Sequence, residues 1–313
     1  MASDKMLGSF DQKSAPEDND LLVEYDAAAS KVKNVKFGGV WNWIVKKLTS
    51  AVINELQTSS KNVVGAINEL NSNSVRNSAA GHNSIFRGKN LGTSYTSAMS
   101  KAIQAGTFDD LYVGDYFTIN GTVYRIAGFN LGKQIGDNAS MGNSMCLVPD
   151  SALYNVQMHN TDSGQYTEGA AANTTTGAYA NSDMRTANLA QATQKIVSDF
   201  GSSHVMSYRD ILPNATADGQ ASGWAWYDCK VELMSETMVY GTKVWANSGY
   251  EVGCINSQFP LFALAPEYIH RRFIYWLRGV GSATDFGLVS NAGYASAYYA
   301  SFSYGVRPFF FVN

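Results

Sequence analysis

The side chains best suited to catalysis are a few histidines and carboxylates, and their spacing does not assemble a catalytic site. The four histidines are His82, His159, His204 and His270. None has another histidine or a cysteine three or four positions away. Paired carboxylates cleave glycosidic bonds, but the sequence does not pair Asp109, Asp110 or Glu232. A glycine-rich phosphate loop and a nucleophile elbow are both missing. We therefore expect no catalytic residue, no metal site and no cofactor.

The three cysteines, Cys146, Cys229 and Cys254, are an odd number and have no short spacing. That pattern argues against a zinc site or a disulfide framework. Three free buried thiols are one expectation. A single bridge between Cys229 and Cys254 is the alternative.

Composition excludes further classes of function. The chain has 313 residues, of which only 16% are charged, and its net charge is -3. Nucleic-acid binding needs clustered Lys and Arg, so no nucleic-acid partner is expected. The sequence has no apolar run of about 20 residues, so no membrane insertion is expected either. The abundant Gly and Tyr, with Ser, Asn and Thr, are typical of extracellular and virion-surface proteins.

Aromatic and small residues alternate irregularly over residues 290–304, near the end of the chain. Tyr provides a large amphipathic contact area with few rotatable bonds, and Ser, Gly and Asn provide adaptable hydrogen bonds. The segment therefore indicates a binding surface. The alternative is a strand pair whose aromatic rings face the core, which accounts well for Phe309, Phe310 and Phe311.

The elements that position this segment follow from turn and cap residues. Residues 97–106 form an expected short helix. Asn120-Gly121 lies between two runs rich in Tyr, Val and Ile, which predicts a β-hairpin over residues 111–129. A second helix is expected to end at Phe200, with Ser182 or Asp183 as its N-cap.

Further strands are short and widely separated. They are expected at residues 230–234 and 273–277 and in pieces over 286–312, with loops at 162–179 and 213–223. Few helices, several short strands and many loops predict an α+β domain.

The N-terminal part has a different character. Residues 1–36 are polar, without a sustained period, and are expected to be flexible or ordered by a partner. Residues 37–72 are expected to form a helical stalk, and residues 73–92 a linker. Apolar residues recur at steps of four and three, at Ile44, Leu48, Val52, Leu56, Val63, Ile67 and Leu70. So narrow a stripe needs a partner, and identical copies are the simplest one.

Residues 53–70, INELQTSSKNVVGAINEL, resemble a repeat of bacteriophage tail-fibre and baseplate proteins. The resemblance implies a short helical stalk in a trimer. The alternative is an ordinary amphipathic helical hairpin.

Residues 93–313 resemble a family of phage and gut-bacterial surface proteins with a C-type-lectin-like fold. The resemblance rests on YVGDYF, VELMSETMVYG, YWLRG and YGVRP in this sequence. It implies a scaffold frame of Trp276, Leu277, Arg278, Gly305, Val306, Arg307 and Pro308. It implies receptor-binding positions at Ala292, Tyr294, Ser296, Ala297, Tyr298, Tyr299, Ser301, Phe302, Ser303 and Tyr304.

The same family includes the variable proteins of diversity-generating retroelements, in which adenines of Asn codons are mutated. Residues 285–313 contain no Lys, Glu, Gln, Met or Trp, the types that a codon ending in a pyrimidine cannot encode. The Tyr, Ser, Ala, Gly and Phe present there are all reachable from an Asn codon.

Together the resemblances imply a receptor-binding protein of a phage tail. It would be made in the host cytoplasm and carried on the virion as a homotrimer. Residues 1–36 would attach it to other tail or baseplate proteins, and residues 93–313 would bind a protein or glycan on the host surface. Two alternatives stay open: a structural baseplate or fibre component, and an enzyme that degrades surface polysaccharide.

Overall fold

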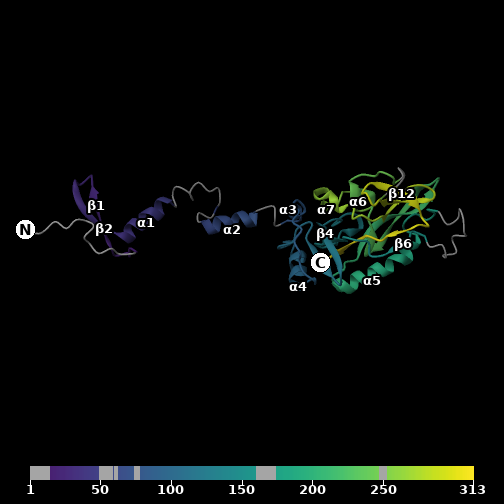
Figure 1. Cartoon of the computed structure of the whole chain (residues 1–313), viewed down its shortest axis with the longest axis horizontal. Helices are drawn as coiled ribbons and strands as arrows, with labels where there is room; N and C mark the ends of the chain where they lie inside the picture. The colour runs from purple at the N-terminus through teal and green to yellow at the C-terminus, as the bar shows by residue number, and fades with distance from the viewer. Residues whose placement is uncertain (1–14, 49–58, 60–62, 74–77, 160–173, 247–251) are drawn as a thin grey trace, which may run out of the picture. The chain divides into compact units, whose positions relative to one another are not determined.

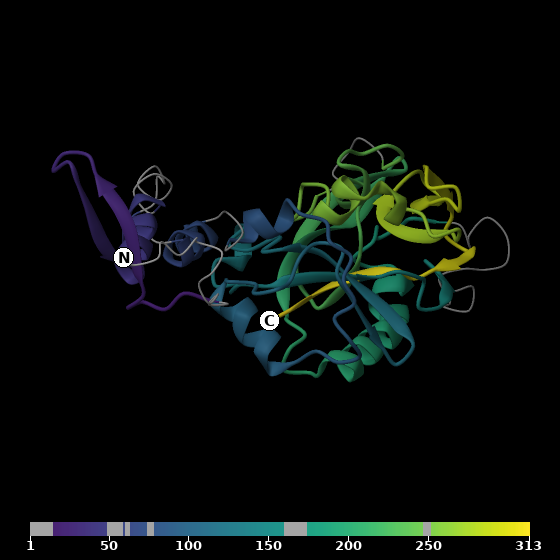
Figure 2. The same cartoon turned by 60° about the vertical axis from the view of Figure 1, so that its left-hand side comes forward.

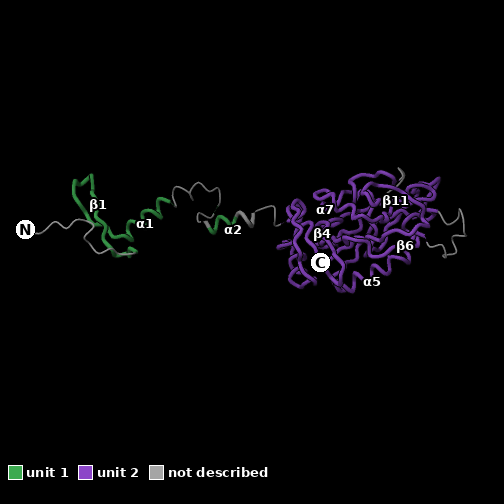
Figure 3. Tube along the Cα trace, in the orientation of Figure 1, with its two compact units in different colours: residues 1–73 green, residues 74–313 purple. Residues whose placement is uncertain are grey.

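A computed structural model describes residues 15–48, 59, 63–73, 78–159, 174–246 and 252–313. The chain divides into two compact units, residues 1–73 and 74–313 (Figure 3). We call the second unit the head and describe each unit by itself.

The first unit begins with a β-hairpin that the sequence did not predict. Strands β1 (Leu21–Asp26) and β2 (Lys31–Lys36) pair antiparallel. The sequence analysis expected these residues to be flexible or ordered by a partner and named no strand among them. Opposite charges face each other across the pair, Glu24 against Lys33, and such cross-strand pairs stabilise a hairpin.

The region predicted as a stalk contains two short helices. They are α1 (Phe37–Leu48) and α2 (Val63–Asn73), of 12 and 11 residues. In the stalk region that the structure describes, no single long helix forms. Two residues of the predicted apolar stripe, Val52 and Leu56, lie outside the described residues. Val63 and Leu70 lie in α2, but the structure does not describe their side chains.

The head is built around a five-stranded sheet in the order β3-β4-β5-β14-β9. Its strands are β3 (Tyr116–Ile119), β4 (Thr122–Phe129), β5 (Met145–Pro149), β9 (Val231–Leu233) and β14 (Pro308–Val312). The expected hairpin is confirmed: β3 and β4 pair around Asn120 and Gly121, whose φ values are 46° and 76°. Positive φ at both positions is what a tight hairpin turn requires.

A second five-stranded sheet has the order β12-β11-β10-β13-β6. Its strands are β6 (Asn155–Gln157), β10 (Tyr275–Val280), β11 (Asp285–Val289), β12 (Ala295–Tyr299) and β13 (Ser303–Gly305). The strand pieces expected over 286–312 are thus confirmed, and they divide between the two sheets. Strand β12 lies at an edge.

A long hairpin lies where the sequence predicted a loop. Strands β7 (Tyr208–Ala217) and β8 (Gln220–Cys229) pair antiparallel. The loop predicted at 213–223 is therefore wrong. Asp218 and Gly219 form the turn with φ values of 52° and 73°. An Asp-Gly pair favours this turn as strongly as Asn-Gly does.

Helices cover the sheets. They are α3 (Ala79–Asn83), α4 (Ser97–Ala105), α5 (Leu189–Phe200), α6 (Glu236–Tyr240) and α7 (Pro260–Leu264), with a π-helical turn η6 (Met184–Asn188) before α5 and 3-10 turns η4 (Gly136–Asn138) and η7 (Pro266–Tyr268). Both expected helices are confirmed. Ser182 Oγ accepts a hydrogen bond from the backbone N–H of Arg185, at 3.3 Å.

The core lies on both faces of strand β14, which pairs with β5 and β9 and whose three phenylalanines are fully buried. The Phe310 ring meets Tyr124 and Phe200 on the α5 side, and the Phe311 ring meets Tyr208. Figures 1 and 2 show α5 on one side of the head with α6 and α7 on the other. Mixed helices and sheets around one core confirm the α+β class.

Residues 78–92 belong to the head, which corrects the linker predicted at 73–92. The buried His82 ring bonds to the Leu111 carbonyl, and Asn83 exchanges two hydrogen bonds with the Phe129 backbone. Arg87 forms an ion pair with buried Asp115, at 2.6 Å. The Ser and Asn residues that suggested a connector are cap and backbone-pairing residues here.

Candidate functional site

The candidate site is a cluster of four aromatic rings on β12, β13 and the turn between them. We call Tyr298, Tyr299, Phe302 and Tyr304 the aromatic patch. The Tyr298 ring centroid lies 4.6 Å from that of Phe302 and 5.9 Å from that of Tyr304. Phe302 also stacks with Tyr304 at 6.1 Å. The short turn brings the two strands' rings together, although the residues alternate irregularly along the chain.

Three of the four rings are open to solvent. The exposed fractions are 42% for Tyr298, 45% for Tyr299 and 44% for Phe302. Tyr304 is half-buried and its ring meets buried Trp276 edge to face at 5.1 Å. Partial burial, with a smaller effect of Tyr298, raises the pKa of Tyr304 above its usual value. Tyr304 thus joins the patch to the core.

The other expected receptor-binding residues are more scattered. Tyr294 is 63% exposed but precedes β12, at the opposite end of that strand from Tyr298 and Tyr299. It is not among the rings that meet in the patch. Ala292 and Ser303 are exposed, whereas Ser296, Ala297 and Ser301 are half-buried.

All seven residues expected to form the scaffold frame are buried. Trp276 Nε1 donates to the Val156 carbonyl at 2.9 Å, which ties β10 to β6. At Gly305 a Cβ atom would lie 2.7 Å from Ala152 Cβ, so only glycine fits without movement. Pro308 pairs with Leu233 at the start of β14.

Two buried arginines fix the frame further. Arg278 Nη1 lies 2.6 Å from Asp210 Oδ2, joining β10 to the β7–β8 hairpin. Arg307 Nε donates to the Pro149 carbonyl at 2.8 Å, and its guanidinium lies over the rings of Phe262 and Tyr275. Buried charges persist only when paired or hydrogen-bonded in this way.

A shallow pocket adjoins the patch and includes a residue that the sequence analysis missed. Asp285, Ala297, Tyr298 and Tyr299 line a volume of about 250 Å³. Asp285 is the only charged residue in 279–306. A single charge in this aromatic-rich segment was the feature of the sequence that could have identified it.

Two of the carboxylates considered for catalysis, Glu232 and Asp110, are bonded to neighbouring side chains. Glu232 is buried, accepts from Tyr179 and Arg185, and burial raises its pKa. Asp110 is exposed and forms ion pairs with Arg87 and Lys89. Glu232 lines a pocket of about 420 Å³ that also includes Asp228, and Asp228 forms an ion pair with Arg209.

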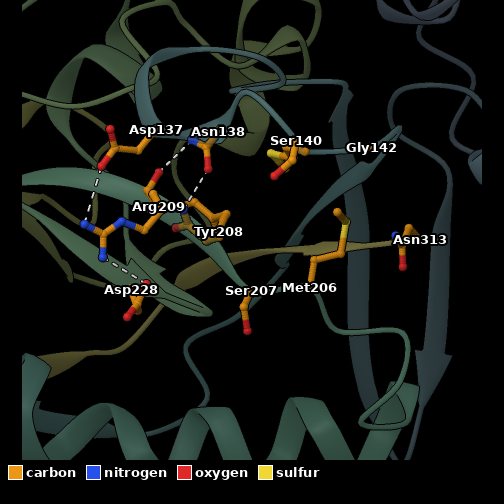
Figure 4. A pocket seen from close by; sticks show the side chains of 11 residues that line it. Asp137, Asn138, Ser140, Gly142, Met206, Ser207, Tyr208, Arg209, Asp228 and Asn313 are labelled. Carbon is orange, nitrogen blue, oxygen red and sulfur yellow. Dashed lines mark hydrogen bonds and ion pairs between the residues drawn. The ribbon is translucent and has the colours of Figure 1, made fainter.

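A polar pocket of about 350 Å³ lies elsewhere in the head (Figure 4). Arg209 stands between Asp137 and Asp228, with N–O distances of 3.4 and 3.0 Å. The Asn138 side chain donates to the Arg209 carbonyl and accepts from the Arg209 backbone N–H, both at 2.7 Å. Arg209 thus pairs with both aspartates that line this pocket.

The cysteines are all buried and free, and burial raises the pKa of Cys254 to about 12. The expected alternative of a Cys229–Cys254 bridge is therefore wrong. Among the described residues, no group of three or more His, Cys, Asp or Glu could hold a metal ion. In the same parts of the chain, no helix combines the length and apolar character that crossing a bilayer requires.

Comparison with protein-family models, with curated proteins and with solved structures found no match to this chain.

Proposed function

We propose that this chain is a receptor-binding protein of a bacteriophage tail, which attaches the virion to a host-cell surface molecule through the aromatic patch. The head would be a C-type-lectin-like domain of the retroelement-variable kind. The observation that carries the proposal is the exposure of three contiguous aromatic rings on a buried frame.

Exposed aromatic clusters are uncommon unless they bind something. Large exposed apolar patches mark interaction sites, and Tyr is enriched among residues that dominate binding energy. A patch ring that becomes buried in a complex contributes about 2 kcal/mol if it is an anchor, which is about thirtyfold in affinity. The rigid frame beneath the patch lowers the entropy lost on binding.

The first unit supports self-association and attachment. Large apolar side chains there are exposed on both the hairpin and the helices, at Leu21, Val23, Tyr25, Val32, Trp41, Trp43, Leu48, Val64 and Ile67. A unit this small with so many exposed apolar residues needs a partner. We propose that copies of the same chain cover α1 and α2 in a trimer, and that the hairpin contacts another tail protein.

Three heads on one stalk would raise the strength of attachment. Multivalent contact increases apparent affinity by about 10²–10⁴ where all heads can engage together. A weak individual head is therefore compatible with firm attachment of the virion.

Binding of the labelled full chain to intact candidate host cells tests the proposal. The test variant combines Tyr298→Ala, Tyr299→Ala and Phe302→Ala; Tyr304 is kept because it packs on Trp276. The control is Phe86→Leu, an exposed aromatic residue near α3, which Figure 1 places at the other end of the head from β12. Circular dichroism first establishes that each variant is folded.

We expect the parent and the control to bind cells and the triple variant not to bind. Equal binding by parent and triple variant would show that the patch is not the receptor site. Binding to an isolated tail protein but to no cell would favour the structural-component alternative. Turnover of host polysaccharide would favour the enzyme.

A further inference from the structure

The pocket beside the aromatic patch combines the carboxylate of Asp285 with the ring of Tyr299. Asp285 on β11 lies directly opposite Tyr299 on β12, and Phe286 lies opposite Tyr298. Opposite residues of an antiparallel pair stand on the same face of the sheet with Cβ atoms about 5 Å apart. The Asp285 and Tyr299 side chains are therefore neighbours, and with Ala297 and Tyr298 they line the pocket.

Neutral hydroxyl groups hold the Asp285 carboxylate in place. Ser282 Oγ donates to Oδ2 at 3.0 Å, and Thr284 Oγ1 donates to Oδ1 at 3.2 Å. The Asp285 backbone N–H donates to Ser282 Oγ at 3.1 Å, which closes the turn before β11. These bonds orient the carboxylate but leave its negative charge uncompensated.

The surroundings supply no positive charge from the nearby chain. Residues 279–306 contain no Lys, Arg or His. Among the described residues, Asp285 takes part in no ion pair. The face of the Tyr299 ring also carries negative potential. The pocket is thus complementary to a cation and repels carboxylate and phosphate groups.

We propose that this pocket binds an alkylammonium group of the host receptor, carried by a lysine side chain or by a choline-type headgroup. The inference rests on the proposed receptor-binding function and names the chemistry that the site recognises. The Asp285 carboxylate attracts the charge, the Tyr299 ring contacts the alkyl substituents, and Ala297 leaves room for them.

Titration of the full chain with small cations tests the proposal directly. The probes are choline chloride, its uncharged isostere 3,3-dimethylbutan-1-ol, and N-acetyl-lysine methylamide, observed by ligand-detected NMR at low ionic strength. We expect at least one cation to bind about tenfold more tightly than the alcohol, with affinity falling as salt is added. The tighter of the two cations identifies the source. Equal binding of choline and the alcohol, or binding of neither cation, overturns the proposal.

Two variants locate the cation. Asp285→Asn keeps an oxygen that accepts from Ser282 or Thr284, and we expect it to lose about tenfold in cation affinity. Tyr299→Leu keeps the carboxylate and should lose about fivefold. The charge-matched control is Asp109→Asn, an exposed carboxylate beyond α4, which Figure 1 places away from β12. Unchanged cation affinity in Asp285→Asn, at an unchanged melting temperature, contradicts the proposal.

Cell binding separates this inference from the function on which it rests. If the triple aromatic variant loses cell binding while Asp285→Asn and free choline or lysine derivative leave it unchanged, the cation inference fails and the receptor-binding function stands. If the triple variant binds cells like the parent, the receptor-binding function itself fails. Loss of cell binding in Asp285→Asn together with competition by a free cation supports both.

Discussion

Replacing Asp210 by Asn removes one charge from the most deeply buried ion pair of the head. The side chains of Asp210 and Arg278 are 0% and 1% exposed, and their N–O distance is 2.6 Å. Asp210 Oδ1 also accepts from the backbone N–H groups of Cys254 and Ile211, at 2.7 and 2.9 Å. Asn keeps an oxygen for those two bonds, so the substitution chiefly leaves the Arg278 charge buried without a counterion.

The expected loss of stability is large. Removing one partner of a buried ion pair costs about 3–5 kcal/mol. For a domain of this size each kcal/mol lowers the melting temperature by about 2–4 °C, so we expect a fall of roughly 6–20 °C. The same substitution at Asp228 is the control. Its side chain is 89% exposed in the ion pair with Arg209, and such surface pairs contribute about 0–1 kcal/mol.

Thermal unfolding of the full chain, followed by near-UV circular dichroism, measures both effects. The double variant Asp210→Leu with Arg278→Met removes both charges and should recover much of the lost stability. The assigned role of this ion pair is wrong if Asp210→Asn melts within about 2 °C of the parent. It is also wrong if Asp210→Asn and the control Asp228→Asn melt at the same temperature.

Three further outcomes are expected. Trp276→Ala leaves a cavity in the core and should cost about 3–5 kcal/mol, measured by denaturant unfolding. Burial raises the pKa of Glu232 above its usual 4.5, so its contribution to stability is full below pH 4.5 and is lost as pH rises through the raised pKa. Melting curves across this range should therefore show Glu232→Gln gaining stability relative to the parent as pH rises. In the first unit, Trp41→Ser with Leu48→Ser removes two exposed apolar side chains from α1 and should reduce the oligomer size in sedimentation velocity experiments.

A hairpin turn could be predicted from its Asn-Gly or Asp-Gly pair only where the flanking residues also had the composition of strands. Asn120-Gly121 lies between apolar strands and was recognised as a hairpin turn. Asp218-Gly219 has the same backbone signature but is flanked by Ala, Thr, Gln and Ser, so its strands resembled a loop. Many residues of that hairpin are half-buried or exposed, so burial imposed no apolar alternation on them.

Long-range pairing was not predictable from the sequence. Asp210 and Arg278 are 68 positions apart, and neither position signals its partner. Residues 78–92 resembled a linker because Ser and Asn suit both connectors and caps, and only the folded head shows their buried partners. The tyrosines of the candidate site could be named from the sequence because they lie close together along the chain. Asp285 could not, because strand pairing brings it to the site.

The sheet of β10 to β13 carries two populations of side chains with different consequences for folding. Trp276 and Gly305 are buried and closely packed, so substitutions there cost cavity or overlap energy. Tyr298 and Phe302 are exposed at one edge and contact mainly each other's rings, so their replacement should change stability little. A head built in this way can change these exposed residues without losing its fold. This separation is a condition that the proposed variable receptor-binding surface must meet.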